Sequence, residues 1–264
     1  MDYNKLCLNV CELAREVGSY AKKERMKFSG LTIETKGKND FVTHVDKESE
    51  RMIIESLKKM LPQSGFIAEE QTSSTVDEKY NWIIDPIDGT TNFIHGLPPH
   101  AISIALKEYD EIVIGVVYEI ALEECFYAWK GDDAFLNGNK IRVSSTQKVN
   151  NCLIATGFPY NDYSRMEEFI DTMRYFFQNS HGLRRIGSAA TDLVYVACGR
   201  FDAFYEYSLK PWDVAAGAFI VEQAGGKITD FSGGNNYLFG KEIIASNAMV
   251  TEEITGIISK KMVK

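Results

Sequence analysis

The chain has 264 residues, 45% of them hydrophobic and 25% charged, which is enough apolar material for the core of one large globular unit. A formal net charge of −8 leaves no excess positive charge for a phosphate backbone or an anionic membrane, so we expect neither a nucleic-acid nor a membrane partner. There is no long uncharged apolar run, and the N-terminal stretch mixes charges throughout, so no transmembrane helix or signal peptide is predicted. Five scattered cysteines without a CxxC pair favour free thiols in a reducing cytoplasm.

The first half of the chain begins with two predicted amphipathic helices, since apolar residues recur every three or four positions over residues 3–27 and 46–61. Short apolar runs at 66–70 and 82–85 end in acids and predict strands. Three further strands are predicted in sequence, at residues 101–108, 112–119 and 124–130, and an Asn-Gly pair that follows them predicts a hairpin turn.

The second half mixes helices and strands. Helices are predicted over 166–177, 188–199 and 213–226 and at the C-terminus, and strands over 202–207, 227–231 and 242–247. The order shows no regular βαβ alternation, so the composition of elements favours a layered α+β fold over a doubly wound parallel sheet. We expect residues 1–264 to form a single unit, with a soft seam near 145–150 between two packed halves.

Two aspartates three residues apart follow an apolar run in residues 82–93, WIIDPIDGTTNF. Like charges this close repel, so either the segment turns into solvent or a positive ion binds between Asp85 and Asp88. Pro86 restricts the backbone between them, and the carbonyl of Ile87 offers another oxygen ligand.

Other acids lie at the ends of predicted elements: Glu69 and Glu70 end one strand, and Asp213 opens a helix. Oxygen ligands without soft donors suit Mg²⁺ or a similar hard ion. Gly89 permits close backbone approach, and a short helix beginning at Thr90 would direct free N–H groups at an anion. Metal ions beside such a helix are what the hydrolysis of a phosphate ester requires.

Simpler interpretations exist for each of these features. The D-x-x-D-G segment alone is an ordinary turn with a helix cap, and Asp213 alone is a helix N-cap. His95 and His100 lie close by in sequence and are interpreted as loop or surface residues rather than ligands. The spacing of the two aspartates is one residue longer than the D-x-D-G-T of haloacid dehalogenase phosphatases, which disfavours a covalent aspartyl-phosphate mechanism.

Three segments in order, FIAEE, WIIDPIDGTTNF and PWDVAAGAFIVEQAGG, resemble the motifs of the inositol monophosphatase family, whose members are Mg²⁺-dependent, lithium-sensitive phosphatases related to fructose-1,6-bisphosphatase. The similarity extends over nearly the whole chain. It implies an αβαβα sandwich, a homodimer, two or three Mg²⁺ ions and hydrolysis of inositol monophosphate or a similar polyol phosphate by metal-activated water.

The resemblance also implies roles for single residues. Those implied to bind metal ions are Glu69, Asp85, the Ile87 carbonyl, Asp88 and Asp213. Those implied to act in catalysis are Glu69 and Thr90, which would activate the attacking water, and Asp46, which would pair with Thr90. Those implied to contact the substrate are Asp88, Gly89, Thr90, Ala189 and Glu206. For Asp46, a helix N-cap is a compatible alternative.

The substrate stays open at this stage. Glu206 favours a polyol leaving group, because a carboxylate accepts hydroxyl hydrogens. Lys210 departs from the animal inositol enzymes, and this lysine or the pair Arg184-Arg185 would suit a second phosphate. The same chemistry on fructose 1,6-bisphosphate, histidinol phosphate, a nucleotide 3′-phosphate or NADP is therefore an alternative, as is a non-catalytic regulatory protein. Lys36 and Glu70 have no assigned role.

Overall fold

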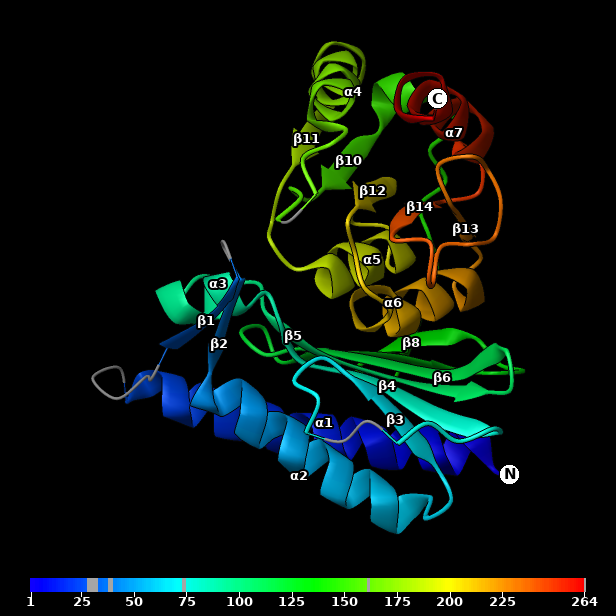
Figure 1. Ribbon diagram of the computed structural model, residues 1–264. Coiled ribbons are helices and arrows are strands. Elements are labelled where there is room, and N and C mark those ends of the chain that lie inside the picture. Colours follow the sequence, from blue (N-terminus) through cyan, green and yellow to red (C-terminus); the bar gives the residue numbers. More distant parts are fainter. Residues whose placement is uncertain (28–32, 38–39, 73–74, 161, 264) are drawn as a thin grey trace.

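The computed structural model shows five layers in the order helices, sheet, helices, sheet, helices (Figure 1). It describes residues 1–27, 33–37, 40–72, 75–160 and 162–263, with the backbone alone for 33–37 and 40–42. The predicted α+β sandwich is confirmed. No helix among the described residues has the length and apolar character needed to cross a membrane.

The first sheet has seven strands in the order β3-β4-β5-β6-β7-β8-β9. β3 and β4 are parallel and the remaining neighbours are antiparallel. The strands are β3 (Gly65–Ala68), β4 (Tyr80–Asp88), β5 (Ala101–Glu108), β6 (Glu111–Glu119), β7 (Glu124–Trp129), β8 (Ala134–Leu136) and β9 (Asn139–Ile141). Helices α1 (Tyr3–Met26) and α2 (His44–Met60) cover one face, and a small hairpin of β1 (Ile33–Gly37) and β2 (Asp40–Thr43) precedes α2.

The second sheet has five strands in the order β11-β10-β12-β14-β13. These are β10 (Leu153–Thr156), β11 (Gly182–Arg184), β12 (Ala203–Tyr207), β13 (Lys227–Thr229) and β14 (Glu242–Ser246). Helices α5 (Ala189–Ala197) and α6 (Pro211–Gln223) lie between the two sheets, and α4 (Met166–Asn179) and α7 (Thr251–Met262) cover the outer face of the second sheet (Figure 1).

Each interface between layers has its own apolar core. One core joins α1 and α2 to the first sheet, a second surrounds α5 and α6, and a third lies under α4 and α7. Helix α6 is buried on nearly every side from Val214 to Val221, as expected of an apolar helix enclosed by two sheets. Gly115 of β6 permits the close approach of this helix, since a Cβ there would lie 2.7 Å from the carbonyl oxygen of Ala216.

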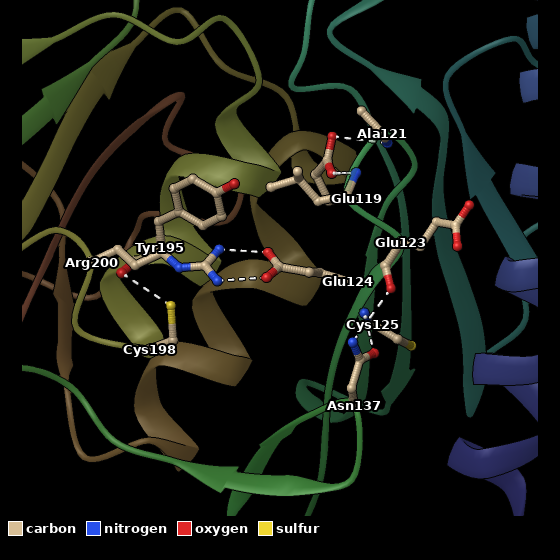
Figure 2. Close-up of polar contacts among 10 residues, drawn as sticks. Glu119, Ala121, Glu123, Glu124, Cys125, Asn137, Tyr195, Cys198 and Arg200 are labelled. Atoms are coloured by element: carbon tan, nitrogen blue, oxygen red, sulfur yellow. Dashed lines mark hydrogen bonds and ion pairs between the residues drawn. The ribbon is translucent and has the colours of Figure 1, made fainter.

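An ion pair joins the first sheet to the segment that follows α5 (Figure 2). Both terminal nitrogens of Arg200 donate to the carboxylate of Glu124 on β7, over 2.5 and 2.6 Å. The guanidinium also lies 4.6 Å from the ring centre of Tyr195. Bidentate geometry and stacking favour arginine over lysine at this position.

Most predicted elements are confirmed, with local corrections. The second helix begins at His44, two residues earlier than predicted, because Thr43 is its N-cap. The strand predicted over residues 82–85 is longer at both ends, since β4 runs from Tyr80 to Asp88 and Asp88 is its last residue. The sequence does not predict the strands β1, β2, β10 and β11, which have three to five residues each.

Candidate active site

A bulge at the end of β4 places Asp85 and Asp88 together. Asp85 pairs with Ser103 of β5 and Asp88 pairs with Ala101, so β4 advances three residues where β5 advances two. Side chains alternate between the faces of a regular strand, and the extra residue brings both aspartates to one side. Proline is tolerated at a bulge, and the N–H of Ile87 donates to Asp85 Oδ1 over 3.0 Å.

Asp213 completes an acidic cluster, by which we mean Asp85, Asp88 and Asp213. One carboxylate oxygen from each of the three lies within 4.8 Å of the others. Asp213 is the third residue of α6, and its Oδ2 accepts the Lys210 N–H over 2.7 Å. The interpretation of Asp213 as the N-cap is therefore wrong, because the cap position belongs to Lys210.

The start of α5 holds Asp88 in place. Asp88 Oδ2 accepts the Ser188 hydroxyl over 2.6 Å and the Ala190 N–H over 2.7 Å. Burial raises the pKa of Asp88 to about 6, and these two donors limit the rise. Ser188 is also the N-cap of α5, so one hydroxyl both begins the helix and orients the carboxylate.

Crowding makes the acidic cluster unfavourable by itself. Burial raises the pKa of Asp85 well above its ordinary value, and the negative charges of Glu69 and Asp88 raise it further. The pKa of Asp213 is raised by burial and then by Asp88. A bound cation would remove both penalties, and an all-oxygen set of ligands fits a hard divalent ion such as Mg²⁺.

Thr90 lies beside the cluster and connects it to α2. Its Oγ1 is 3.2 Å from Asp46 Oδ1 and 3.0 Å from the Ile87 carbonyl oxygen. Asp46 is buried and accepts the Thr43 N–H over 2.9 Å as the third residue of a capping box. The alternative of Asp46 as the N-cap is therefore wrong, and its second oxygen is directed at Thr90.

Gly89 links the cluster to the short helix α3 (Thr90–His95) and has a left-handed backbone with φ of 89°. A Cβ at this position would lie 3.0 Å from the Gly187 carbonyl oxygen and 3.2 Å from that of Pro99. Both the dihedral angle and the crowding require glycine. The predicted start of a helix at Thr90 is confirmed.

A cavity of about 340 Å³ opens over the acidic cluster. Its lining also includes Arg185, Ala189, Asp192 and Glu206, which we call the α5–β12 side. Glu206 is 5% exposed and packs so closely on Gly157 that a Cβ there would come within 1.9 Å of its Oε2. Arg185 donates to the Tyr160 hydroxyl over 2.6 Å and lies against the ring of Phe158.

The other candidate residues take different places. Glu69 and Lys210 line the cavity, whereas Arg184 is exposed at the end of β11. His100 is buried, 3.2 Å from the Leu97 carbonyl oxygen, and His95 is outside the cavity lining. The side chain of Lys36 lies outside the described residues.

Sequence reasoning missed several residues of the site: Glu50, Gly157, Ser188 and Asp192. Glu50 accepts the N–H groups of Glu70 and Thr72 over 2.7 and 2.8 Å, which fixes the loop after Glu69. A signal existed for Glu50, because an acid on the apolar stripe of α2 is unusual unless it is paired.

Comparison with known proteins identifies the family to which this layered α+β fold and its acidic cavity belong. The model of the inositol monophosphatase family matches residues 4–262, so the chain belongs to that family. A protein of Neisseria meningitidis serogroup B named putative Nus factor SuhB is 42% identical over 93% of this chain and 95% of its own.

Two further relatives bear names that include the phosphatase activity. The inositol-1-monophosphatase of Mesorhizobium japonicum is 35% identical over 97% of both chains. The solved structure of the Thermotoga maritima IMPase superposes with a TM-score of 0.87 at 36% identity and covers 98% of each chain.

Proposed function

We propose that the protein is a Mg²⁺-dependent phosphomonoesterase that hydrolyses inositol monophosphate or a similar polyol phosphate. The observation that carries this proposal is the convergence of Asp85, Asp88 and Asp213 on one wall of a polar cavity. Membership of the inositol monophosphatase family supports the same chemistry.

The metal-binding residues of the proposal are Glu69, Asp85, the Ile87 carbonyl, Asp88 and Asp213, for two or three ions. When bound, Mg²⁺ lowers the pKa of water and neutralises charge on the phosphate. The negative charges of Glu69, Asp88 and Asp213 all raise the pKa of Asp85, so a bound cation would relieve this carboxylate in particular.

The remaining residues position the reactants. The Thr90 hydroxyl donates toward Asp46 Oδ1 and the Ile87 carbonyl oxygen, which leaves its lone pairs to orient the attacking water together with Glu69. The N–H groups of Gly89 and Thr90 hold the phosphate at the start of α3. Ala189 and Glu206, which also line the cavity, contact the leaving group.

Phosphate release from a panel of esters tests the proposal. We expect turnover that needs Mg²⁺, stops with a chelator and is suppressed by lithium. The panel contains inositol 1-phosphate, fructose 1,6-bisphosphate, histidinol phosphate, a nucleotide 3′-phosphate and NADP. Unchanged turnover in the chelator would contradict metal-dependent catalysis.

Two observations favour alternatives. Arg185 and Lys210 are the basic residues that line the cavity within the described chain, which favours a substrate with a second phosphate. The relatives named Nus factors favour a function other than hydrolysis, and on this fold it would be that of a non-catalytic metal-binding or phosphate-binding regulator. Binding of Mg²⁺ and inositol phosphate by calorimetry, without turnover on any ester, would support the second alternative.

Four further features stay predictions: a homodimer, a cytoplasmic location, no nucleic-acid partner and a soft seam at residues 145–150. Sedimentation at several concentrations tests the dimer, and retention on immobilised RNA tests the expected absence of a nucleic-acid partner. Limited proteolysis tests the seam, where we expect the first cleavage of the native chain if the halves separate there.

A further inference from the structure

Asp192 is a buried carboxylate that the proposed mechanism does not use. It lies on α5, three residues after Ala189, and is 1% exposed. It lines the cavity, and its Oδ1 has no hydrogen-bond partner within the described chain. The cap of α5 is Ser188, so Asp192 has no capping role that would explain its burial.

An orphaned acceptor of this kind is unfavourable in the free protein. Buried polar atoms in native proteins are nearly always paired, so each exception needs an explanation. For an acceptor on a cavity wall, we take that explanation to be a ligand that pairs with it. Burial raises the pKa of Asp192 well above its ordinary value, and the charges of Glu206 and Asp88 add to the rise. The protein therefore maintains an unfavourable carboxyl group at the wall of its cavity.

The surroundings of Asp192 indicate which ligand it would take. Glu206 belongs to the same wall, and no described side chain or backbone group donates a hydrogen bond to its carboxylate. The positive charge of Arg185 lowers the pKa values of Asp192 and Glu206 and partly offsets the negative charges of the two acids. A second anion would face two carboxylates here, whereas hydroxyl groups would find two acceptors.

We propose that Asp192 is a specificity-determining residue that, with Glu206, binds neighbouring hydroxyl groups of the leaving alcohol. This inference rests on the proposed phosphatase function and narrows its substrate class. The preferred ester is one whose leaving group carries at least two hydroxyls within reach of both carboxylates. Esters without these hydroxyls leave buried acceptors unpaired, and sites built to bind hydroxyls discriminate strongly on that basis.

Two variants and two substrates test the proposal. Asp192→Leu removes both oxygens, and Asp192→Asn keeps Oδ1 as an acceptor. Inositol 1-phosphate carries the hydroxyls, and p-nitrophenyl phosphate lacks them. We expect Asp192→Leu to lower the ratio of kcat/KM for inositol 1-phosphate over p-nitrophenyl phosphate by about tenfold to a hundredfold, mainly through KM. Asp192→Asn should restore most of the ratio.

Thermal unfolding separates this role from a structural one. Asp192→Leu should raise Tm, because the variant no longer buries an unpaired carboxyl. The matched control is Arg200→Ala. Arg200 follows the same helix, lies outside the cavity lining, and loses its ion pair with Glu124 in this variant. This control should lower Tm and leave the substrate ratio unchanged.

The outcomes are distinct from those of the proposed function. If the wild-type protein hydrolyses neither ester with Mg²⁺, the phosphatase proposal fails. In that case calorimetry measures the affinity of the wild-type protein and of Asp192→Leu for inositol 1-phosphate. If the wild-type protein is active and Asp192→Leu keeps its substrate ratio within twofold, or loses both activities equally, the role of Asp192 is overturned. Equal or undetectable binding of inositol 1-phosphate by both proteins would overturn it as well.

Discussion

On one side of the cavity, the carboxylates of Asp88 and Asp213 accept hydrogen bonds from Ser188, Ala190 and the Lys210 N–H. On the α5–β12 side, Asp192 and Glu206 receive none from the described residues. The first arrangement fixes the direction of each carboxylate before any ligand binds. The second leaves acceptor capacity free for the ligand itself.

This difference suits two kinds of ligand. A small divalent ion needs oxygens at set positions, and the groups behind its ligands maintain them. A polyol brings its own hydrogens and needs acceptors that are not already used. Changes on the two sides should therefore differ in their consequences, the first affecting catalysis on every ester and the second affecting the choice of ester.

The largest effect is expected when a ligand of the acidic cluster is neutralised. Asp85→Asn and Asp213→Asn should each lower kcat/KM by several orders of magnitude on every ester, because one lost ligand disorders the metal clamp. The control is Asp110→Asn, whose carboxylate is fully exposed in a hairpin turn outside the cavity lining. Steady-state phosphate release measures the effect, and a loss confined to inositol esters would remove the distinction between the two sides.

A smaller effect is expected on stability as pH changes in the absence of metal. The pKa of Asp88 is raised to about 6 in the folded protein, so the folded state retains a proton that the unfolded state releases near pH 4. This contribution to stability is complete below pH 4 and is lost as pH rises through 6. It amounts to about 3 kcal/mol for Asp88 alone, at about 1.4 kcal/mol per pKa unit.

Urea unfolding with a chelator, at intervals between pH 4 and 8, measures this loss. Mg²⁺ should restore more stability at pH 7.5 than at pH 5, because at the lower pH the ion must displace protons. In the matched variant Asp88→Asn, the loss with rising pH should become smaller. The proposed role of Asp88 in this loss would be contradicted if, with the chelator present, the wild-type protein and Asp88→Asn gained the same amount of stability from pH 5 to 7.

For Ser188→Ala we expect weaker metal binding, an effect smaller than the loss of a ligand of the acidic cluster. The variant removes the hydroxyl that orients Asp88, and loss of such a supporting group lowers metal affinity by about tenfold to a hundredfold. Ser188→Thr keeps the hydroxyl and should restore most of the affinity. Magnesium titration of activity separates this effect from the modest loss of stability that follows loss of the α5 cap.

The sequence predicts those features of the fold and the site that depend on residues close together in the chain, and it misses those that depend on pairing between distant segments. The strand, the proline and the glycine within a few residues of Asp85 and Asp88 make them candidate ligands, and the resemblance to a family assigns them the role. The bulge that brings them to one side is a property of the pairing with β5 and leaves no local pattern. The long periodic helices were predicted for the same local reason.

The α5–β12 side was less accessible to prediction. Ser188 and Asp192 read as the ordinary start of an apolar helix, and Gly157 follows a four-residue strand that was not detected. Their roles arise only when α5 packs between the sheets and presents its first turn to β4 and β12. Glu206 was proposed through the resemblance to a family, and its own sequence neighbourhood reads as an ordinary strand.

The smallest effect concerns Gly157 and tests the α5–β12 side alone. A Cβ at Gly157 would lie 1.9 Å from Glu206 Oε2, so Gly157→Ala must displace that carboxylate. We expect KM for inositol 1-phosphate to rise about tenfold, the lower end of what a methyl group in a pocket produces, while p-nitrophenyl phosphate is hydrolysed as before.

Gly256→Ala is the matched control, because a Cβ there on α7 meets no atom within 4 Å. That variant should gain a little stability from helix propensity and keep both KM values. Equal increases of KM for both esters in Gly157→Ala would mean that the displaced Glu206 disturbs the acidic cluster as well. The two sides of the cavity would then be one cooperative network, in which acceptors for hydroxyls and ligands for metal cannot be changed separately.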